Sequence, residues 1–361
     1  MTNSNLDNPY KGLPSKSFYR SSVSDRNMFN INGLWKPKFR FSPDMKIVSF
    51  GSCFAQHIGK ALKSRGYNFY ITEAAPSRFT EEQKKQFNYE LFSCRTGNIY
   101  TTSLFLQWLN WAAQKEIPPA EVYEFEGRFY DLFRPNIEPK GFVSVEELRN
   151  SLGQTIRSFK AAIRDADVVV FTLGLTESWF CNEGGYEYPI CPGTVAGEYD
   201  PERHKFKNQN YESVKHSLIK ALEVMRELNP RSKLLLTVSP VPLAATYSNE
   251  HVLIATQYSK SVLRAVAGSL ASEDSDIDYF PSFEIISSPP FRGTFYQPDQ
   301  RHVTEQGVSH VMDNFFSAIS DKYTANSESK DLRPVDKFVS LEDTGECEEE
   351  LLAAFSPKGL L

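Results

Sequence analysis

The sequence lacks a long apolar run, an excess of basic residues and an apolar signal core. No stretch of the 361 residues approaches the roughly 18 uncharged apolar residues of a membrane-spanning helix, so we expect no membrane span. The formal net charge of -5 gives no basic field that would gather phosphates, which argues against nucleic acid as a partner. The opening stretch, MTNSNLDNPYKGLPSKSFYR, is polar, and we therefore expect a cytoplasmic protein.

Cysteine is also scarce and irregularly spaced. The five cysteines are an odd number, and none of them forms a C-x-x-C pair. This pattern argues against a disulfide framework and against a structural zinc site, so we expect no metal. The ordinary interpretation of each cysteine is a reduced thiol that packs as a small apolar side chain.

Three regions differ in composition. Residues 1–44 are polar without a hydrophobic period, as is typical of an N-terminal extension laid over a domain. Residues 45–325 contain the apolar runs and helical periods of one α/β domain. Residues 326–361 form an acidic C-terminal tail with too few apolar side chains for its own core, although a short amphipathic helix is expected near residues 342–355.

Strands and helices are predicted to alternate within the domain. We expect strands at 46–50, 67–72, 167–174, 232–240 and 277–280, and helices at 54–64, 101–116, 145–166, 210–230, 251–271 and 304–319. Residues 121–133 suggest a hairpin around Gly127, whereas residues 178–208 show no period and are interpreted as a long loop. Alternating strands and helices favour a parallel sheet covered on both faces, whose ligands bind beyond the carboxyl ends of the strands.

The segment GSCFAQHIGKA begins where the first predicted strand ends, and it places Ser52 beside Cys53. Its glycine and lysine spacing does not fit a phosphate-binding loop. Backbone N–H groups at a helix start can receive an oxyanion, and the same position favours the thiolate form of a thiol. The structural alternative is Ser52 as a helix cap with Cys53 packed beneath it. His57 follows one helical turn later, as a base or as a residue lining the pocket.

Two other polar clusters follow predicted strands. Asp299 precedes His302 by three residues, and a carboxylate beside an imidazole can orient it and stabilise its charged form during general-base catalysis. The alternative is a turn residue followed by a surface histidine. Thr176 and Glu177 follow the strand at 167–174, where the threonine hydroxyl could donate to an oxyanion or cap a helix.

This arrangement resembles the SGNH (GDSL-like) hydrolase superfamily, and FGSCFA at residues 50–55 resembles the name motif of the GSCFA family within it. Similar to that family are also TGNIYTT (96–102), EGRFYDLFRP (126–135), TVSPVP (237–242) and DQRH (299–302), so the resemblance extends from about residue 45 to 320. It implies a three-layer α/β/α sandwich with a five-stranded parallel sheet in the flavodoxin-like topology of SGNH hydrolases.

The resemblance also implies roles for individual residues. Gly51, Ser52 and Cys53 correspond to the superfamily's Gly-Asp-Ser, which makes Cys53 the implied nucleophile and leaves Ser52 as the alternative. Asp299 and His302 match the last block unchanged and are implied as orienting carboxylate and base. The implied oxyanion donors are the backbone N–H groups of Cys53 and Gly97, together with Asn98 or Thr176. Thr176 stands where the superfamily has its oxyanion asparagine.

The implied function is an enzyme that acts on acyl ester bonds through a covalent acyl-enzyme. Ester hydrolysis of an acylated carbohydrate or similar metabolite is the first expectation. O-acyl transfer to a polysaccharide or glycan, with acyl-CoA as the donor, and a catalytically silent carbohydrate-binding domain are the alternatives. No other cofactor is expected, and the oligomeric state is left open. The candidates for binding substrate are His57, Gly174, Glu177 and Trp179. Trp179 belongs to the 178–208 region, whose aromatic residues could stack on a sugar ring.

Overall fold

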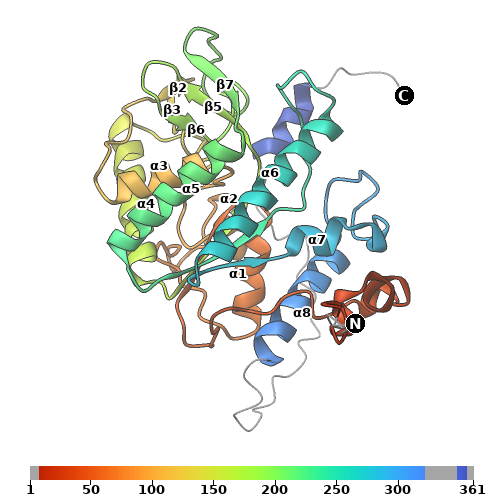
Figure 1. The fold of residues 1–361 in the computed structure, drawn as a ribbon. Helices are drawn as coiled ribbons and strands as arrows, with labels where there is room; N and C mark the ends of the chain where they lie inside the picture. The colour runs from red at the N-terminus through yellow and green to blue at the C-terminus, as the bar shows by residue number, and fades with distance from the viewer. Residues whose placement is uncertain (1–7, 322–347, 356–361) are drawn as a thin grey trace, which may run out of the picture.

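A parallel sheet of four strands forms the centre of the computed structural model, which describes residues 8–321 and 348–355 (Figure 1). Its strands, in spatial order, are β1 (Ile47–Gly51), β4 (Val168–Leu173), β8 (Lys233–Val238) and β9 (Ile277–Phe280). The predicted parallel α/β fold is therefore confirmed. The predicted strand at 67–72 contributes a single parallel bridge, from Phe69 to Ile47, so a five-stranded sheet is not confirmed.

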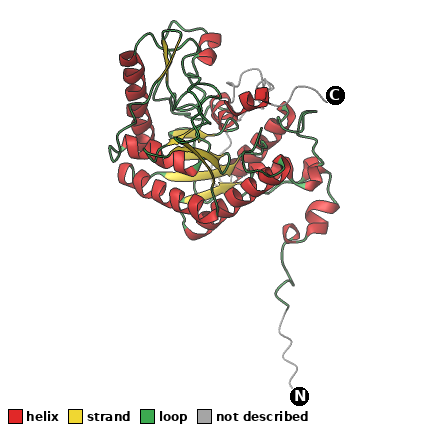
Figure 2. Cartoon of the chain, turned by 90° about the horizontal axis from the view of Figure 1, so that it is seen from above, coloured by secondary structure: helices red, strands yellow, loops and turns green. Residues whose placement is uncertain are grey.

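The sheet is buried on both faces, because alternate side chains of its strands enter two different cores. Val48, Val169 and Leu234 belong to one core, whereas Val168 and Leu235 belong to the other. The first core includes side chains of α3 (Thr102–Ala112), α4 (Val145–Asp165), α5 (Tyr211–Leu228) and α6 (Val252–Glu273); the second includes side chains of α1 (Ala55–Ser64), α7 (Ser282–Ser287) and α8 (Glu305–Asp321). Figure 2 shows the strands lying between these helices.

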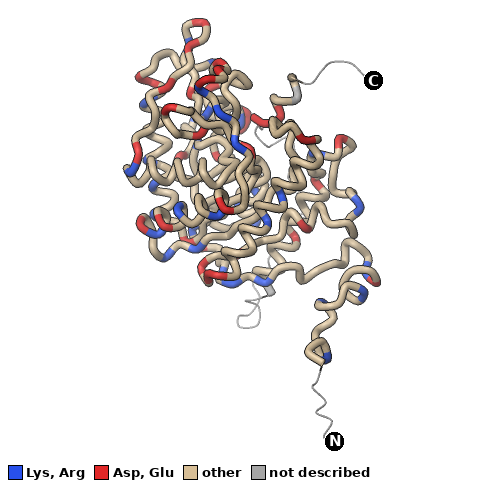
Figure 3. The backbone as a smooth tube through the Cα atoms, turned by 45° about the horizontal axis from the view of Figure 1, so that its top comes forward, with Lys and Arg blue, Asp and Glu red and all other residues tan. Residues whose placement is uncertain are grey.

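The other helical elements of the described residues are short. They are α2 (Glu81–Gln86), η1 (Ser15–Ser17), η2 (Arg20–Ser24), η3 (Met28–Asn30), η4 (Pro289–Phe291) and η7 (Glu348–Phe355). Within the ranges that the structure describes, no helix is long and apolar enough to cross a membrane. Lys and Arg are interspersed with Asp and Glu along the chain (Figure 3).

Part of the N-terminal extension packs into the domain. The Trp35 side chain is buried in the second core, where its ring stacks on Phe315 at 5.3 Å and meets the edge of Phe280 at 5.1 Å between ring centroids. Phe41 packs beside Trp35 in the same core. These aromatic contacts fasten residues 35–41 to the sheet and to α8.

The region predicted as a long loop, residues 178–208, contains a second sheet instead. Its antiparallel strands are β5 (Glu177–Cys181), β6 (Glu187–Tyr188) and β7 (His204–Asn208), in the order β6-β5-β7. These strands are too short, and their charged and aromatic residues too mixed, for a clear period of two. The predicted hairpin is confirmed as β2 (Tyr123–Phe125) and β3 (Arg128–Tyr130). The hairpin and the second sheet both lie near α3 (Figure 1).

Gly51 closes β1 in a conformation that only glycine adopts readily. Its φ is +132°, and a Cβ added there would lie 2.3 Å from the backbone oxygen of Thr172 on β4. This close approach lets the chain leave the sheet sharply and enter the turn that precedes α1.

Replacing Gly51 by alanine should destabilise the protein strongly, because the added Cβ would collide with backbone atoms of Thr172, which cannot move aside. Gly66→Ala is the matched control, since Gly66 also has a positive φ but its added Cβ would meet no atom within 4 Å. The free energy of unfolding, measured by urea denaturation, should fall by about 3 kcal/mol or more for Gly51→Ala and by about 1 kcal/mol for Gly66→Ala. Equal losses would contradict the close-approach argument.

Candidate active site

The turn after β1 buries Ser52 and leaves Cys53 more accessible. Helix α1 begins at Ala55, and its cap residue Phe54 makes no side-chain capping bond, so the alternative that Ser52 caps this helix is wrong. Ser52 is 3% exposed, and its hydroxyl oxygen has no hydrogen-bond partner among the described residues. Cys53 is partly exposed and carries a free thiol. A reagent or substrate can therefore reach Cys53 more easily than Ser52.

Residues 97–100 lie across the carboxyl ends of β1 and β4. The backbone N–H of Ile99 donates to the Gly51 oxygen at 2.9 Å, and that of Gly174 donates to the Tyr100 oxygen at 2.9 Å. Asn98, which directly precedes Ile99, is buried. The structure thus brings three of the regions that we predicted from the sequence to one edge of the sheet.

Asp299 and His302 form the predicted carboxylate–imidazole pair. Oδ2 of Asp299 contacts Nδ1 of His302, while Oδ1 accepts the backbone N–H groups of Arg301 at 3.0 Å and His302 at 3.1 Å. Burial raises the pKa of Asp299, but these hydrogen bonds outweigh burial and lower the pKa to about 2. The carboxylate stays ionised at neutral pH and fixes the imidazole so that Nε2 is its reactive nitrogen.

Nε2 of His302 contacts another carboxylate. Oε1 of Glu350, from the C-terminal element η7, lies 2.9 Å from this nitrogen. Burial lowers the pKa of His302, but the hydrogen bonds to Asp299 and Glu350 outweigh burial, and the pKa is raised above its ordinary value. More of the imidazole is therefore protonated at neutral pH than in a solvated histidine.

Thr176 is placed differently from the expectation. Its hydroxyl donates to Oδ1 of Asn208 on β7 at 2.7 Å, and its backbone N–H donates to the Ser259 hydroxyl at 3.0 Å. Because this hydroxyl proton is already used, the geometry speaks against Thr176 as an oxyanion donor. The helix that Thr176 would alternatively cap is absent as well, since Glu177 begins strand β5.

His57 is a buried neutral imidazole. Burial, with a smaller contribution from Lys60, lowers the pKa of His57 to about 4. Its ring packs edge-on against Phe54, with 5.4 Å between the ring centroids. Burial opposes uptake of a proton by His57, whereas the Asp299 carboxylate supports it at His302, so His302 is the better candidate base.

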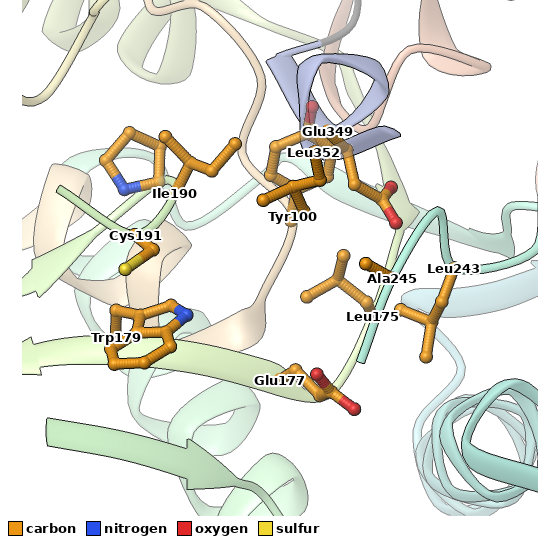
Figure 4. Close-up of a pocket in the computed structure, with 11 residues that line it drawn as sticks. Tyr100, Leu175, Glu177, Trp179, Ile190, Cys191, Leu243, Ala245, Glu349 and Leu352 are labelled. Carbon is orange, nitrogen blue, oxygen red and sulfur yellow. The ribbon is translucent and has the colours of Figure 1, made fainter. Parts of the chain in front are cut away.

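A cavity of about 60 Å³ lies beside this sheet edge (Figure 4). Trp179, Leu175 and Leu243 contribute apolar wall, and Glu177 contributes a carboxylate that accepts hydrogen bonds from Thr246 and the Tyr247 backbone. Trp179 is held by aromatic neighbours, its ring lying 4.9 Å from that of Tyr247, 5.5 Å from Phe206 and 5.6 Å from Tyr199. Two of the four predicted substrate-binding residues therefore line the cavity.

Sequence reasoning missed two cations near the site. Lys260 on α6 is buried, and its Nζ donates to the Gly174 oxygen at 2.6 Å. Its position, three residues before Leu263 and seven before Ala267, falls on the buried face of the helix, and that periodicity was the available signal. The second cation is Arg301, which lies between Asp299 and His302 in the sequence. Across the described ranges, no three His, Cys, Asp or Glu side chains are grouped to hold a metal ion.

Comparison with protein families gives a match over most of the chain. A family model described as the GSCFA family matches residues 46–315. An acetyl esterase mutant solved with an acetate ion is 15% identical, with 46% of this chain covering 66% of that one, under two thirds of its length, at a TM-score of 0.25. A family 3 carbohydrate esterase of Clostridium thermocellum is 11% identical, with 78% of this chain covering 98% of that one, at a TM-score of 0.31. No curated protein matches the chain.

Iodoacetamide should modify Cys53 faster than the other described cysteines, as peptide mass spectrometry would measure. Cys94 and Cys181 are buried, and burial raises the pKa of Cys191 to about 11, which leaves little of the reactive thiolate at neutral pH. Cys347 lies outside the described residues. Faster modification of Cys191 than of Cys53 would contradict this order.

Removing the Glu350 carboxylate should lower the pKa of His302, because that hydrogen bond and charge favour the imidazolium. NMR titration of the histidine ring signals would measure the shift in Glu350→Gln. Any activity that needs neutral His302 should then begin at lower pH. Glu227→Gln, on an exposed ion pair with Lys115, is the control and should leave the titration unchanged. An unchanged pKa in Glu350→Gln would refute the contact.

Proposed function

The chain belongs to the GSCFA family, and we propose that it is an esterase that hydrolyses acyl esters through an acyl-enzyme on Cys53. The observation that carries the proposal is the Asp299–His302 pair, whose carboxylate holds Nδ1 and so makes Nε2 the nitrogen for proton transfer. The partly exposed thiol after β1 supports Cys53 over the buried Ser52 as nucleophile.

The proposed reaction has two halves. In the first, the Cys53 sulfur attacks the ester carbonyl carbon, and the thiol proton passes to Nε2 of His302. The tetrahedral oxyanion accepts hydrogen bonds from the backbone N–H groups of Cys53 and Gly97 and from the Asn98 amide. The oxyanion then collapses, the C–O bond to the alcohol breaks, and the alcohol leaves with the proton from His302.

Water completes the second half. His302 takes a proton from water as its oxygen attacks the thioester carbonyl of the acylated Cys53. A second oxyanion forms in the same place, the C–S bond breaks, and the proton returns to the sulfur. The products are the free acid and the original thiol, so no metal ion or redox group takes part in these steps.

An acylated carbohydrate is the substrate class that the cavity supports best. Trp179 provides an aromatic face beside the small cavity, and aromatic faces pack well against sugar rings. The adjacent Glu177 carboxylate supplies acceptors for sugar hydroxyl groups.

The first test compares the two candidate nucleophiles and the two candidate bases. On an activated acetyl ester, Cys53→Ala should abolish turnover while Ser52→Ala retains most of it. His302→Ala should lower kcat by about 10²–10⁴-fold, the usual contribution of general-base assistance, whereas His57→Ala should cost much less. Full activity in Cys53→Ala combined with loss in Ser52→Ala would reverse the assignment of the nucleophile.

O-acyl transfer is the second candidate, because a thioester on Cys53 reacts with hydroxyl groups as well as with water. Candidate sugar acceptors added to an assay with an activated acetyl ester should leave the yield of acetate unchanged if the enzyme is a hydrolase. Acetylated sugar formed at the expense of acetate would make the enzyme a transferase. Absence of turnover with every acyl donor, in folded protein with unmodified Cys53, would favour a silent binding domain.

A further inference from the structure

Residues 348–352, here called the acidic segment, lie in the candidate active site although they belong to the C-terminal region. They form the first part of η7, and Glu348 and Glu349 are buried. Figure 4 shows Glu349 and Leu352 projecting from this element toward the cavity that Trp179 and Glu177 line. The three consecutive glutamates differ in their hydrogen-bond partners, and two of them also approach Arg301.

Glu348 occupies the candidate oxyanion donor. Its carboxylate accepts hydrogen bonds from the Asn98 side-chain amide and, at 3.0 Å, from the Tyr100 hydroxyl. Burial raises the pKa of Glu348, and these two bonds compensate only in part. The Glu348 carboxylate thus accepts the hydrogen bond from the Asn98 amide that a substrate oxyanion would otherwise accept.

Glu350 occupies the candidate base. Its Oε1 lies 2.9 Å from Nε2 of His302 and 3.7 Å from Nη1 of Arg301. Since Asp299 holds Nδ1, Nε2 is the nitrogen that must take the proton from Cys53. While Glu350 is bound there, that nitrogen cannot contact the thiol.

Glu349 and Leu352 anchor the segment between these two contacts. Oε1 of Glu349 accepts the Ala244 backbone N–H at 2.7 Å, and Oε2 lies 3.7 Å from Nη2 of Arg301. Arg301 and Lys260 both attract the Glu349 carboxylate. The Leu352 side chain lines the cavity. The two cations that sequence reasoning missed thus help to hold the Glu349 carboxylate.

We propose that the acidic segment inhibits the enzyme in cis, because it fills the oxyanion site with Glu348 and blocks the base with Glu350. The inference rests on the proposed function for the roles of Asn98 and His302. Substrate and segment compete for the same donors, so turnover requires the segment to leave. The fraction of molecules with an empty site then scales the apparent activity.

The test uses the full-length chain with two charge reversals, Glu348→Lys and Glu350→Lys. Lysine cannot accept from Asn98 or His302, and it repels Arg301, so the segment should leave the site. Two readouts are measured: kcat/KM on an activated acetyl ester, and the rate of Cys53 alkylation by iodoacetamide, which needs no turnover. Both should rise by about tenfold or more.

Two controls separate displacement from other effects. Glu227→Gln, at an exposed ion pair, should change neither rate. A synthetic peptide of residues 348–355 added to the double variant should slow both rates again, whereas the same peptide with lysine at positions 348 and 350 should not. Melting temperatures verify that each variant is folded.

The outcomes are distinguishable. A faster alkylation of Cys53 without ester turnover in any variant would refute the proposed function and leave the occupancy of the site supported. A fall in kcat/KM in the double variant would overturn the inhibitory role, because the segment would then complete the active site. Unchanged alkylation and unchanged turnover would also overturn it.

Discussion

Backbone hydrogen bonds at the carboxyl ends of β1 and β4 hold the elements of the candidate site together. Gly51 pairs with Thr172 in the sheet register, and its carbonyl oxygen also accepts from Ile99. Tyr100 then accepts from Gly174 beyond the end of β4. These bonds join backbone atoms, and the glycine at position 51 permits the close approach to Thr172. The buried Lys260 side chain adds a hydrogen bond to the Gly174 oxygen at the same edge. Cys53, Asn98 and Leu175 each lie within two residues of a bonded position, so this junction places their backbone at the edge.

The electrostatics of this edge explain why a carboxylate lies in the site. Groups that would stabilise a developing negative charge, such as the Asn98 amide and Arg301, also bind a permanent one. The acidic segment supplies three carboxylates, and burial opposes the ionised form of two of them, Glu348 and Glu349. Their binding therefore depends on compensation by the site, as charge burial requires. The oxyanion formed from a substrate exists only briefly. The substrate therefore has to displace a permanent carboxylate that belongs to the same chain.

Much of the fold was predictable, because its strands are continuous apolar runs and its helices keep a clear period. The Asp299–His302 pair was predictable because the two residues are only three positions apart in the sequence. At that separation, in the turn before α8, their side chains can contact each other. Long-range contacts were not predictable: nothing near Thr176 in the sequence indicates that its hydroxyl meets Asn208 on another strand. The glutamates at 348–350 read as part of a solvated acidic tail, since their partners lie 250, 105 and 48 residues away.

The central claim is that Cys53 carries the acyl group. Acid added to the protein shortly after an activated acetyl ester should stop deacylation and preserve the acyl-enzyme for peptide mass spectrometry. We predict an acetyl group on the Cys53 sulfur, located by fragmentation and removed by neutral hydroxylamine, as a thioester is. An acetyl group on Ser52 that resists hydroxylamine, or acetylation at Cys191 in place of Cys53, would contradict the account.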